Sequence, residues 1–196
     1  MAIIVVTPPA IEPITLEEAR THIRSDSADD GTEVTQFIET ARVKMEAKLR
    51  RALITQTLDI FRDSFPGLLG VIEIPRPPTQ SVTSITYLDT NGDSQTLSAS
   101  NYVVTTNSTP ARIVPADGEQ WPDTQVMVDA VTIRIVAGYG DAAADVPAPI
   151  VQGMLLAITD MYDHRGTQII GAAASAMPIT VDRVISEYKT YIPEEW

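Results

Sequence analysis

The sequence predicts an α+β fold: a small α-helical bundle with an inserted antiparallel β subdomain. Apolar residues recur at steps of three and four over 34–52 and again over 150–162, which is the period of a helix. Between them, over 54–140, short runs rich in β-branched residues alternate with Pro, Gly, Asn and Asp, as in strands joined by turns. Because these runs follow one another so closely, they favour antiparallel pairing over alternating strand and helix units.

Two helices are expected in the N-terminal part of the chain. The first begins at Thr15, whose hydroxyl can accept from the amide of Glu18 while the Glu18 carboxylate accepts from the amide of Thr15. After an acidic turn, Asp30 and Glu33 form a second potential capping pair before a longer helix. The apolar stripe of this longer helix comprises Val34, Phe37, Ile38, Ala41, Met45, Leu49 and Ala52, with most charged residues off the stripe.

Six strands are expected in the central region. Their sequences are ITQTLDIFRD, VIEI, SVTSITYLD, NYVVTT, ARIVP and VMVDAVTIRIVAG. A hairpin turn is predicted over 89–93, because Asn91 and Gly92 tolerate positive φ. The prolines within 75–78 lack an amide proton, so they belong in a connection or at a sheet edge.

The helical pattern returns after Pro147. The apolar face over 150–162 is too broad for a helix with one exposed side, so this helix is expected at the centre of the bundle. The following small, weakly patterned residues predict a mobile loop or a segment that becomes ordered on assembly. Within one structural unit, the expected parts are the N-terminal helices (1–53), the β subdomain (54–140), the returning helix (141–166), and a loop with a C-terminal docking helix and tail (167–196).

Composition and charge exclude several classes of function. Hydrophobic residues make up 44% and charged residues 20% of the 196 residues, which is typical of a folded globular chain. The net charge of −12 argues against sequence-specific DNA binding, because affinity for phosphate comes largely from Lys and Arg. The absence of cysteine excludes disulfides and thiolate chemistry. Neither a secretory signal nor a membrane span is expected, since the apolar runs are too short.

No catalytic residue, cofactor or metal site is expected from the sequence. His22 and His164 are the only histidines, and each fits a packing or helix-terminal position without further function. The acidic turns that begin at Asp26 and Asp89 do not place ligands in the register of a calcium loop. Paired acids of a glycoside hydrolase stay an alternative, which would require two carboxylates roughly 5 to 10 Å apart in a concave pocket.

Several motifs, taken in order, resemble the head-tail connector, or adaptor, proteins of tailed bacteriophages and phage-like gene transfer agents. The similarity extends over about residues 7–165. Its motifs are the TLEEA helix start, the RALITQT helix-to-strand junction, the PRPP connection before SVTSITYLD, and then WP and AGYG before the Pro-rich helix start.

The resemblance implies a structural component of the virion and not an enzyme. Such a protein forms a ring, twelvefold in the particle, beneath the portal protein, and joins the portal to a neck stopper or tail-completion protein at the head-tail interface. The ring is assembled in the bacterial host cytoplasm and leaves a channel for passing DNA without binding it specifically. An acidic wall would discourage DNA from adhering to such a channel. The alternatives are a neck stopper or tail-completion protein, or a particle-associated glycan hydrolase.

Two sets of residues are candidates for contacts in such an assembly. Acids of the turn before the long helix could meet bases near the end of that helix in a neighbouring subunit. The alternative is that these bases form a solvated helix face with charge that suits the helix C-terminus. The candidate subunit-interface residues are Asp26, Asp29, Asp30, Arg42, Lys44, Lys48, Arg50 and Arg51. The C-terminal helix and tail are expected to dock on the portal, or alternatively to fold back onto their own core. The candidate docking residues are Val181, Val184, Ile185, Tyr188, Tyr191, Ile192 and Trp196.

Overall fold

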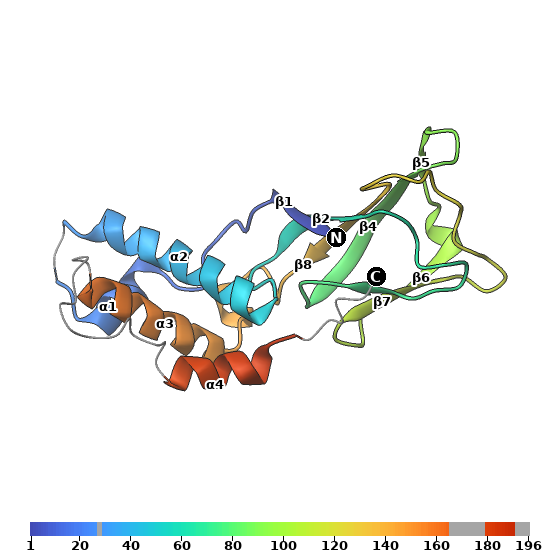
Figure 1. Ribbon diagram of the computed structural model, residues 1–196. Helices are drawn as coiled ribbons and strands as arrows, with labels where there is room; N and C mark the ends of the chain where they lie inside the picture. The colour runs from blue at the N-terminus through green and yellow to red at the C-terminus, as the bar shows by residue number, and fades with distance from the viewer. Residues whose placement is uncertain (27–28, 165–178, 191–196) are drawn as a thin grey trace. The chain divides into compact units, whose positions relative to one another are not determined.

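The chain has an α+β fold built from two compact units that alternate along the sequence. A computed structural model describes residues 1–26, 29–164 and 179–190. The helical unit contains the described residues of 11–54 and 140–189. The sheet unit contains 1–10, 55–139 and Thr190. Figure 1 shows the helices and the strands gathered in separate parts of the chain.

The helical unit is arranged around α3. Its helices are α1 (Leu16–Ile23), α2 (Gly31–Leu49), α3 (Ala148–Asp163) and α4 (Ile179–Tyr188). The predicted central position of α3 is confirmed, because this helix contacts α1, α2 and α4 (Figure 1). The predicted stripe of α2 is also buried, apart from the partly exposed Phe37. The buried apolar residues of α2 and α3 are Val34, Ile38, Ala41, Met45, Leu49, Ile150, Met154 and Ile158.

The two helix starts differ from each other. The capping box of α1 is confirmed, since the Thr15 amide donates to Glu18 Oε2 at 2.8 Å and the Glu18 amide donates to Thr15 Oγ1 at 3.2 Å. At α2, Asp30 occupies the capping position, but its side chain makes no capping hydrogen bond. The second predicted capping pair is therefore wrong, because the Asp30 carboxylate is bonded to other elements.

The sheet unit contains two antiparallel sheets. The larger has the strand order β1-β2-β8-β4-β5, and the smaller has the order β3-β7-β6. The strands are β1 (Ala2–Thr7), β2 (Gln56–Arg62), β3 (Ile72–Ile74), β4 (Thr79–Leu88), β5 (Ser94–Thr96), β6 (Tyr102–Thr105), β7 (Ala111–Pro115) and β8 (Val131–Ala137), with short 3₁₀ helices at Ala99–Asn101 and Ala143–Asp145. Leu58, Ile60, Ile85, Ile133 and Ile135 are buried in the larger sheet.

All six predicted strands are present, and so is the predicted turn. In that turn Asp89 Oδ1 accepts from the amides of Asn91 at 2.9 Å and Asp93 at 3.0 Å, while Gly92 has a φ of 89°. The prolines of 75–78 lie in the connection between β3 and β4, as expected.

Strands β1 and β5 were not expected from the sequence. The N-terminal part had been assigned to helices, but Ala2–Thr7 pairs with β2 and belongs to the sheet unit. Most of its side chains are exposed, so β1 lacks the alternation of buried and exposed residues that identifies a half-buried strand. The expected loop over 167–177 lies outside the described residues.

Candidate interaction surfaces

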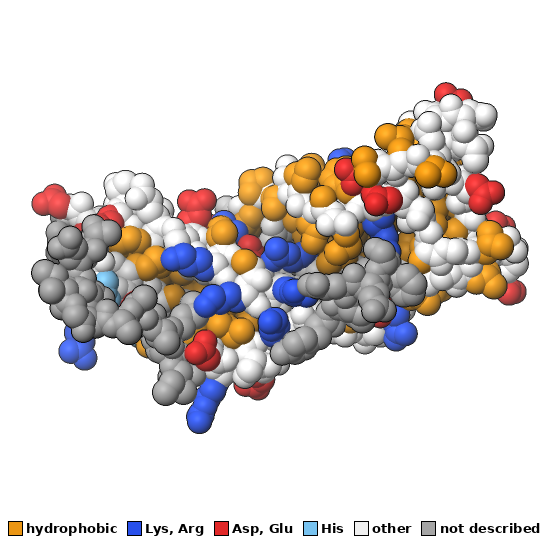
Figure 2. Space-filling model, in the orientation of Figure 1, with side chains coloured by type: hydrophobic (Ala, Val, Ile, Leu, Met, Phe, Trp, Pro, Cys, Tyr) orange, Lys and Arg blue, Asp and Glu red, His pale blue; other side chains and the backbone are white. Residues whose placement is uncertain are grey.

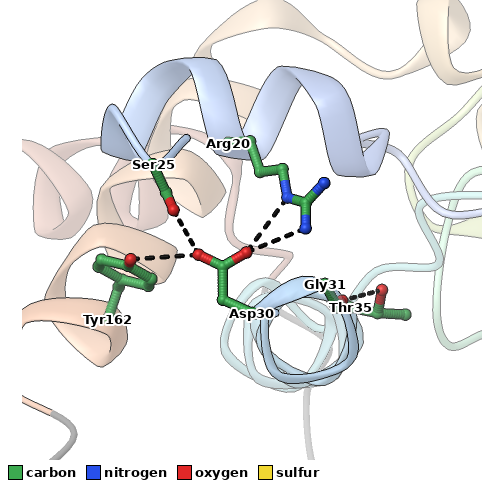
Figure 3. Close-up of polar contacts among 6 residues, drawn as sticks. All are labelled: Arg20, Ser25, Asp30, Gly31, Thr35 and Tyr162. Carbon is green, nitrogen blue, oxygen red and sulfur yellow. Dashed lines mark hydrogen bonds and ion pairs between the residues drawn. The ribbon is translucent and has the colours of Figure 1, made fainter. Parts of the chain in front are cut away.

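The acidic turn before α2 is held together by contacts within the chain (Figure 3). Asp30 Oδ1 accepts from Arg20 Nε at 3.2 Å and from Arg20 Nη2 at 3.0 Å, while Oδ2 accepts from the Ser25 hydroxyl and from the Tyr162 hydroxyl, the latter at 3.2 Å. The Ser25 hydrogen bond, followed by the contacts with Arg20 and Tyr162, holds the pKa of Asp30 below its ordinary value. Asp30 thus joins α1, the turn and α3 to the start of α2.

This arrangement removes Asp30 from the candidate subunit interface. The side chain is buried, and its hydrogen bonds are made inside the helical unit. The sequence had indicated Asp30 as a helix cap and as a candidate for the subunit interface. Asp26 and Asp29 remain exposed on the same turn.

Arg42 is also an internal residue, although the sequence placed it off the apolar stripe. Its Nε donates to Glu12 Oε2 at 2.8 Å and its Nη1 to Glu46 Oε2 at 3.1 Å. Glu46 Oε1 in turn accepts from the Leu53 amide at 2.9 Å. Burial alone would lower the pKa of Arg42, but the two carboxylates outweigh it and raise the pKa. The prediction that Arg42 faces another subunit is therefore wrong.

The other basic residues in α2 and directly after it differ in how exposed their side chains are. Arg51 Nε donates to the backbone carbonyl of Tyr188 at 2.6 Å, which connects the end of α2 to α4. Arg50 is half-buried, whereas Lys44 and Lys48 are exposed. Figure 2 shows several Lys and Arg side chains on this face of the helical unit. Lys44 and Lys48 are the exposed members of the predicted basic set.

The described part of the C-terminal docking segment packs on its own bundle. Helix α4 contacts α3 and α2, and Val181 is fully buried. The alternative of folding back onto the core therefore applies to α4, and the expectation that Val181 is free to dock elsewhere is wrong. Val184, Ile185 and Tyr188 are partly exposed. The remaining docking candidates Tyr191, Ile192 and Trp196 lie outside the described residues.

The histidines are not part of a metal site in the described part of the chain. His164 Nδ1 lies 2.9 Å from the Asp160 carbonyl oxygen, at the exposed end of α3. Within residues 1–26, 29–164 and 179–190, no group of three or more His, Asp and Glu side chains is placed to hold a metal ion. The helices of the same residues are all too short or too polar to cross a bilayer.

The sequence analysis did not predict one surface of the sheet unit. Segments 63–68 and 121–128 line a cavity of about 710 Å³, and large apolar side chains stand beside it. We call the following five residues, which are 44% to 102% exposed, the apolar surface: Leu68, Leu69, Val126, Met127 and Val128. Hydrophobic side chains reach the surface over the sheet unit in Figure 2.

The apolar surface was missed because its second half was predicted as a strand. The run VMVDAVTIRIVAG has a strand-like composition throughout, but β8 begins only at Val131. Asp129 adopts a left-handed conformation with a φ of 56°, which ends any extended structure before β8. Residues 126–128 therefore lie in a loop, and the only sequence signal was an apolar triplet followed by Asp.

The fold has counterparts among solved structures of gene transfer agent particles. The sequence matches no protein-family model and no curated protein sequence. A chain from the neck of an empty gene transfer agent particle, computed with C6 symmetry, superimposes with a TM-score of 0.78 at 21% identity. This chain has the fold of a gene transfer agent neck chain. The match covers 98% of this chain and 97% of that one.

Two further structures give the same result. A chain from the neck of the native particle, computed with C12 symmetry, matches with a TM-score of 0.77 at 21% identity. A chain from the virion of the native gene transfer agent matches with a TM-score of 0.77 at 20% identity. Both matches cover 98% of this chain and 97% of the other, so the helical and sheet units are both shared.

Proposed function

We propose that this protein is a head-tail adaptor of a phage-like particle. Copies of it form a twelvefold ring beneath the portal, and the ring joins the portal to the next neck or tail component. The observation that carries the proposal is the fold shared along 98% of the chain with chains of gene transfer agent necks, one of them computed with C12 symmetry. The ordered sequence motifs over residues 7–165 support the same assignment.

The charge of the chain suits a ring that surrounds DNA in transit. At −12 per copy, the ring carries a strong negative potential, and repulsion keeps phosphate from adhering to its wall within about 8 to 10 Å at physiological salt. The protein acts mechanically, without catalysis and without specific DNA contacts. Its site of action is the head-tail interface of the virion.

The structure narrows the residues available for contacts between subunits. Arg42 and Asp30 are committed to buried interactions, whereas Asp26, Lys44 and Lys48 are exposed. We propose that Lys44 and Lys48 of one copy lie opposite the acidic turn of the next. Opposite charges brought together in this way offset the repulsion between acidic subunits.

The partly exposed apolar residues of the C-terminal helix are the proposed portal contact. Val184, Ile185 and Tyr188 keep part of their surface exposed after α4 has packed on the bundle. Tyr188 is of a residue type that is enriched among those that dominate interface energies. The tail residues Tyr191, Ile192 and Trp196 extend the same proposal.

The decisive measurement is the native mass of the protein alone and mixed with its cognate portal. We expect a discrete portal-bound assembly with twelve copies of this chain, and we expect Lys44→Glu with Lys48→Glu to weaken it. Arg112→Glu reverses one charge at an exposed position on β7, outside the helical unit, and is the control for Lys44→Glu and Lys48→Glu taken singly. A chain that binds another neck protein but never the portal would be assigned to the stopper or tail-completion level. Failure to assemble with any neck component would overturn the proposal.

A further inference from the structure

Two stacked aromatic rings line the cavity beside the apolar surface. Phe65 and Trp121 are buried, and their rings lie parallel within 3° with centroids 4.9 Å apart. Trp121 Nε1 donates to the Gly70 carbonyl at 2.7 Å, and the Trp121 amide donates to the Leu68 carbonyl at 3.0 Å. The loop that carries Leu68 and Leu69 is therefore fixed at both of these carbonyls.

The second loop is fixed in the same manner. The Gln125 amide donates to the Leu88 carbonyl at 3.0 Å, and the Asp129 amide donates to Asp63 Oδ1 at 3.0 Å. These bonds lie on either side of residues 126–128. The three apolar side chains of this loop are thus presented to solvent by a backbone held at both ends.

Five large apolar side chains exposed in two loops beside one cavity require an explanation. Contiguous apolar patches on soluble proteins commonly mark contacts with other molecules. The lining of the adjoining cavity contains Asp63 and Asp123 but no Lys or Arg. A complementary ligand would therefore combine apolar side chains with positive charge.

We propose that the apolar surface binds a segment of a different neck protein, in which apolar side chains stand next to Lys or Arg. This inference rests on the proposed function for the choice of partner. A second copy bound through the same surface is a poor occupant, because a self-complementary contact would bring Asp63 and Asp123 of both copies together. Head-to-tail binding of another copy at this surface would be detected by the sedimentation test below. The apolar loops supply contact area, and the two carboxylates orient the basic residue of the partner.

The test uses overlapping synthetic peptides that cover the portal and the neck proteins encoded together with this chain. Binding of each peptide to the full chain is measured by fluorescence anisotropy. We expect the peptides that bind to contain apolar residues beside Lys or Arg. Their affinity should fall at least tenfold with Leu69→Glu or Val128→Glu, and Asp123→Lys should weaken it as well.

The control is Val103→Glu, which introduces the same charge at a 53% exposed position on β6, outside both loops. All four substituted side chains are exposed, and circular dichroism and thermal melting verify that each variant is folded. Affinity that is unchanged in Leu69→Glu and Val128→Glu overturns the inference, and so does a preference for acidic peptides. Sedimentation that shows the wild type self-associating through this surface, with the association lost in both variants, also overturns it.

Failure of this inference can be distinguished from failure of the proposed function. If the wild type assembles with the portal but binds none of the peptides, the inference fails and the adaptor assignment stands. If the chain assembles with no neck component while basic apolar peptides still bind at the apolar surface, the surface chemistry stands and the adaptor assignment fails.

Discussion

Asp30 shows how a single carboxylate can act on several elements at once. A residue in its position would ordinarily accept from amides of the first helical turn, but this side chain accepts from Arg20, Ser25 and Tyr162. The start of α2 is consequently secured by tertiary contacts. The stability of this helix start therefore depends on the negative charge of the Asp30 carboxylate.

We expect Asp30→Asn to lower the melting temperature at neutral pH by several degrees. The pKa of Asp30 lies below its ordinary value of 3.8, so its contribution to stability is fully present above that value and is lost as the pH falls through the folded pKa. The difference between wild type and variant should therefore shrink in acid. Thermal melts between pH 2.5 and pH 7 measure it, with the exposed Asp26→Asn as control. A difference that persists unchanged at low pH would contradict this account.

Arg62 differs from Asp30, because it is a buried charge in the larger sheet without an ionic partner among the described residues. Burial lowers the pKa of Arg62, and within the described residues no carboxylate forms an ion pair with it. Arg134 instead donates from Nε and Nη2 to the two oxygens of Asp59, each at 2.7 Å. The two arginines should therefore respond differently to replacement by an apolar residue.

We expect Arg62→Met to raise the free energy of unfolding by about 1 kcal/mol, because a desolvated charge without an ionic partner is replaced by a side chain of similar length. Arg134→Met should lower the free energy of unfolding, because it leaves the Asp59 carboxylate buried without its partner. Urea denaturation of both variants measures the effects. Destabilisation by Arg62→Met would show that its guanidinium has a compensating interaction.

At the scale of elements, α3 packs directly against α2. A Cβ atom at Gly153 would lie 3.1 Å from Met45 Cε and 3.8 Å from Val184 Cγ1. Glycine at this position thus allows α3 to approach both neighbouring helices.

We expect Gly153→Val to destabilise the chain by about 1 to 3 kcal/mol through overpacking against Met45. Gly153→Ala should have a small effect, because Met45 is flexible enough to yield by a few tenths of an ångström. Gln152→Val places the same side chain at the neighbouring exposed position and is the control. Equal stability of the two valine variants, measured by urea denaturation, would refute the packing argument.

The burial of Val181 makes α4 a part of the bundle. Val181→Asp places an unpaired charge against α2 and α3, and we expect it to lower the free energy of unfolding by about 3 kcal/mol. Ser186→Asp adds the same charge on the exposed side of α4 and should be nearly neutral. If chemical denaturation finds both variants as stable as wild type, α4 is not required for the stability of the bundle.

The sequence predicted those elements whose signal is local. Helices α1, α2 and α3 and six of the strands follow from periodicity, caps and turn residues within short windows. Strand β1 could not be predicted in this manner, because it is defined by pairing with β2, at least 50 residues further along the chain. The interaction surfaces were less predictable than the fold. Arg42 was placed on an exposed face because its partner Glu12 is distant in sequence and close only in space.

At the scale of the whole molecule, the two units are not successive domains. The chain begins in the sheet unit, forms α1 and α2, returns to the sheet unit, and then forms α3 and α4. Mutational effects on the two units can still be distinguished, because each has its own set of buried residues. The proposed ring contacts lie on the helical unit, whereas the apolar surface lies on the sheet unit, so the variants that test them affect different units.

The parallel bridge between Ile54 and Gly140 has a consequence for engineering and for evolution. Bridged residues of neighbouring strands lie about 5 Å apart, so the two ends of the segment 55–139 leave the helical unit side by side. The segment 55–139 is therefore an insertion whose two ends can be joined by a short connection. Replacing it with a short Gly-Ser linker, with residues 1–10 removed, should leave a chain that melts cooperatively with a helical circular dichroism spectrum. An exchange of this segment between relatives would have to include β1, because β1 pairs with β2. The helices would meanwhile keep the adjacent chain ends at Ile54 and Gly140.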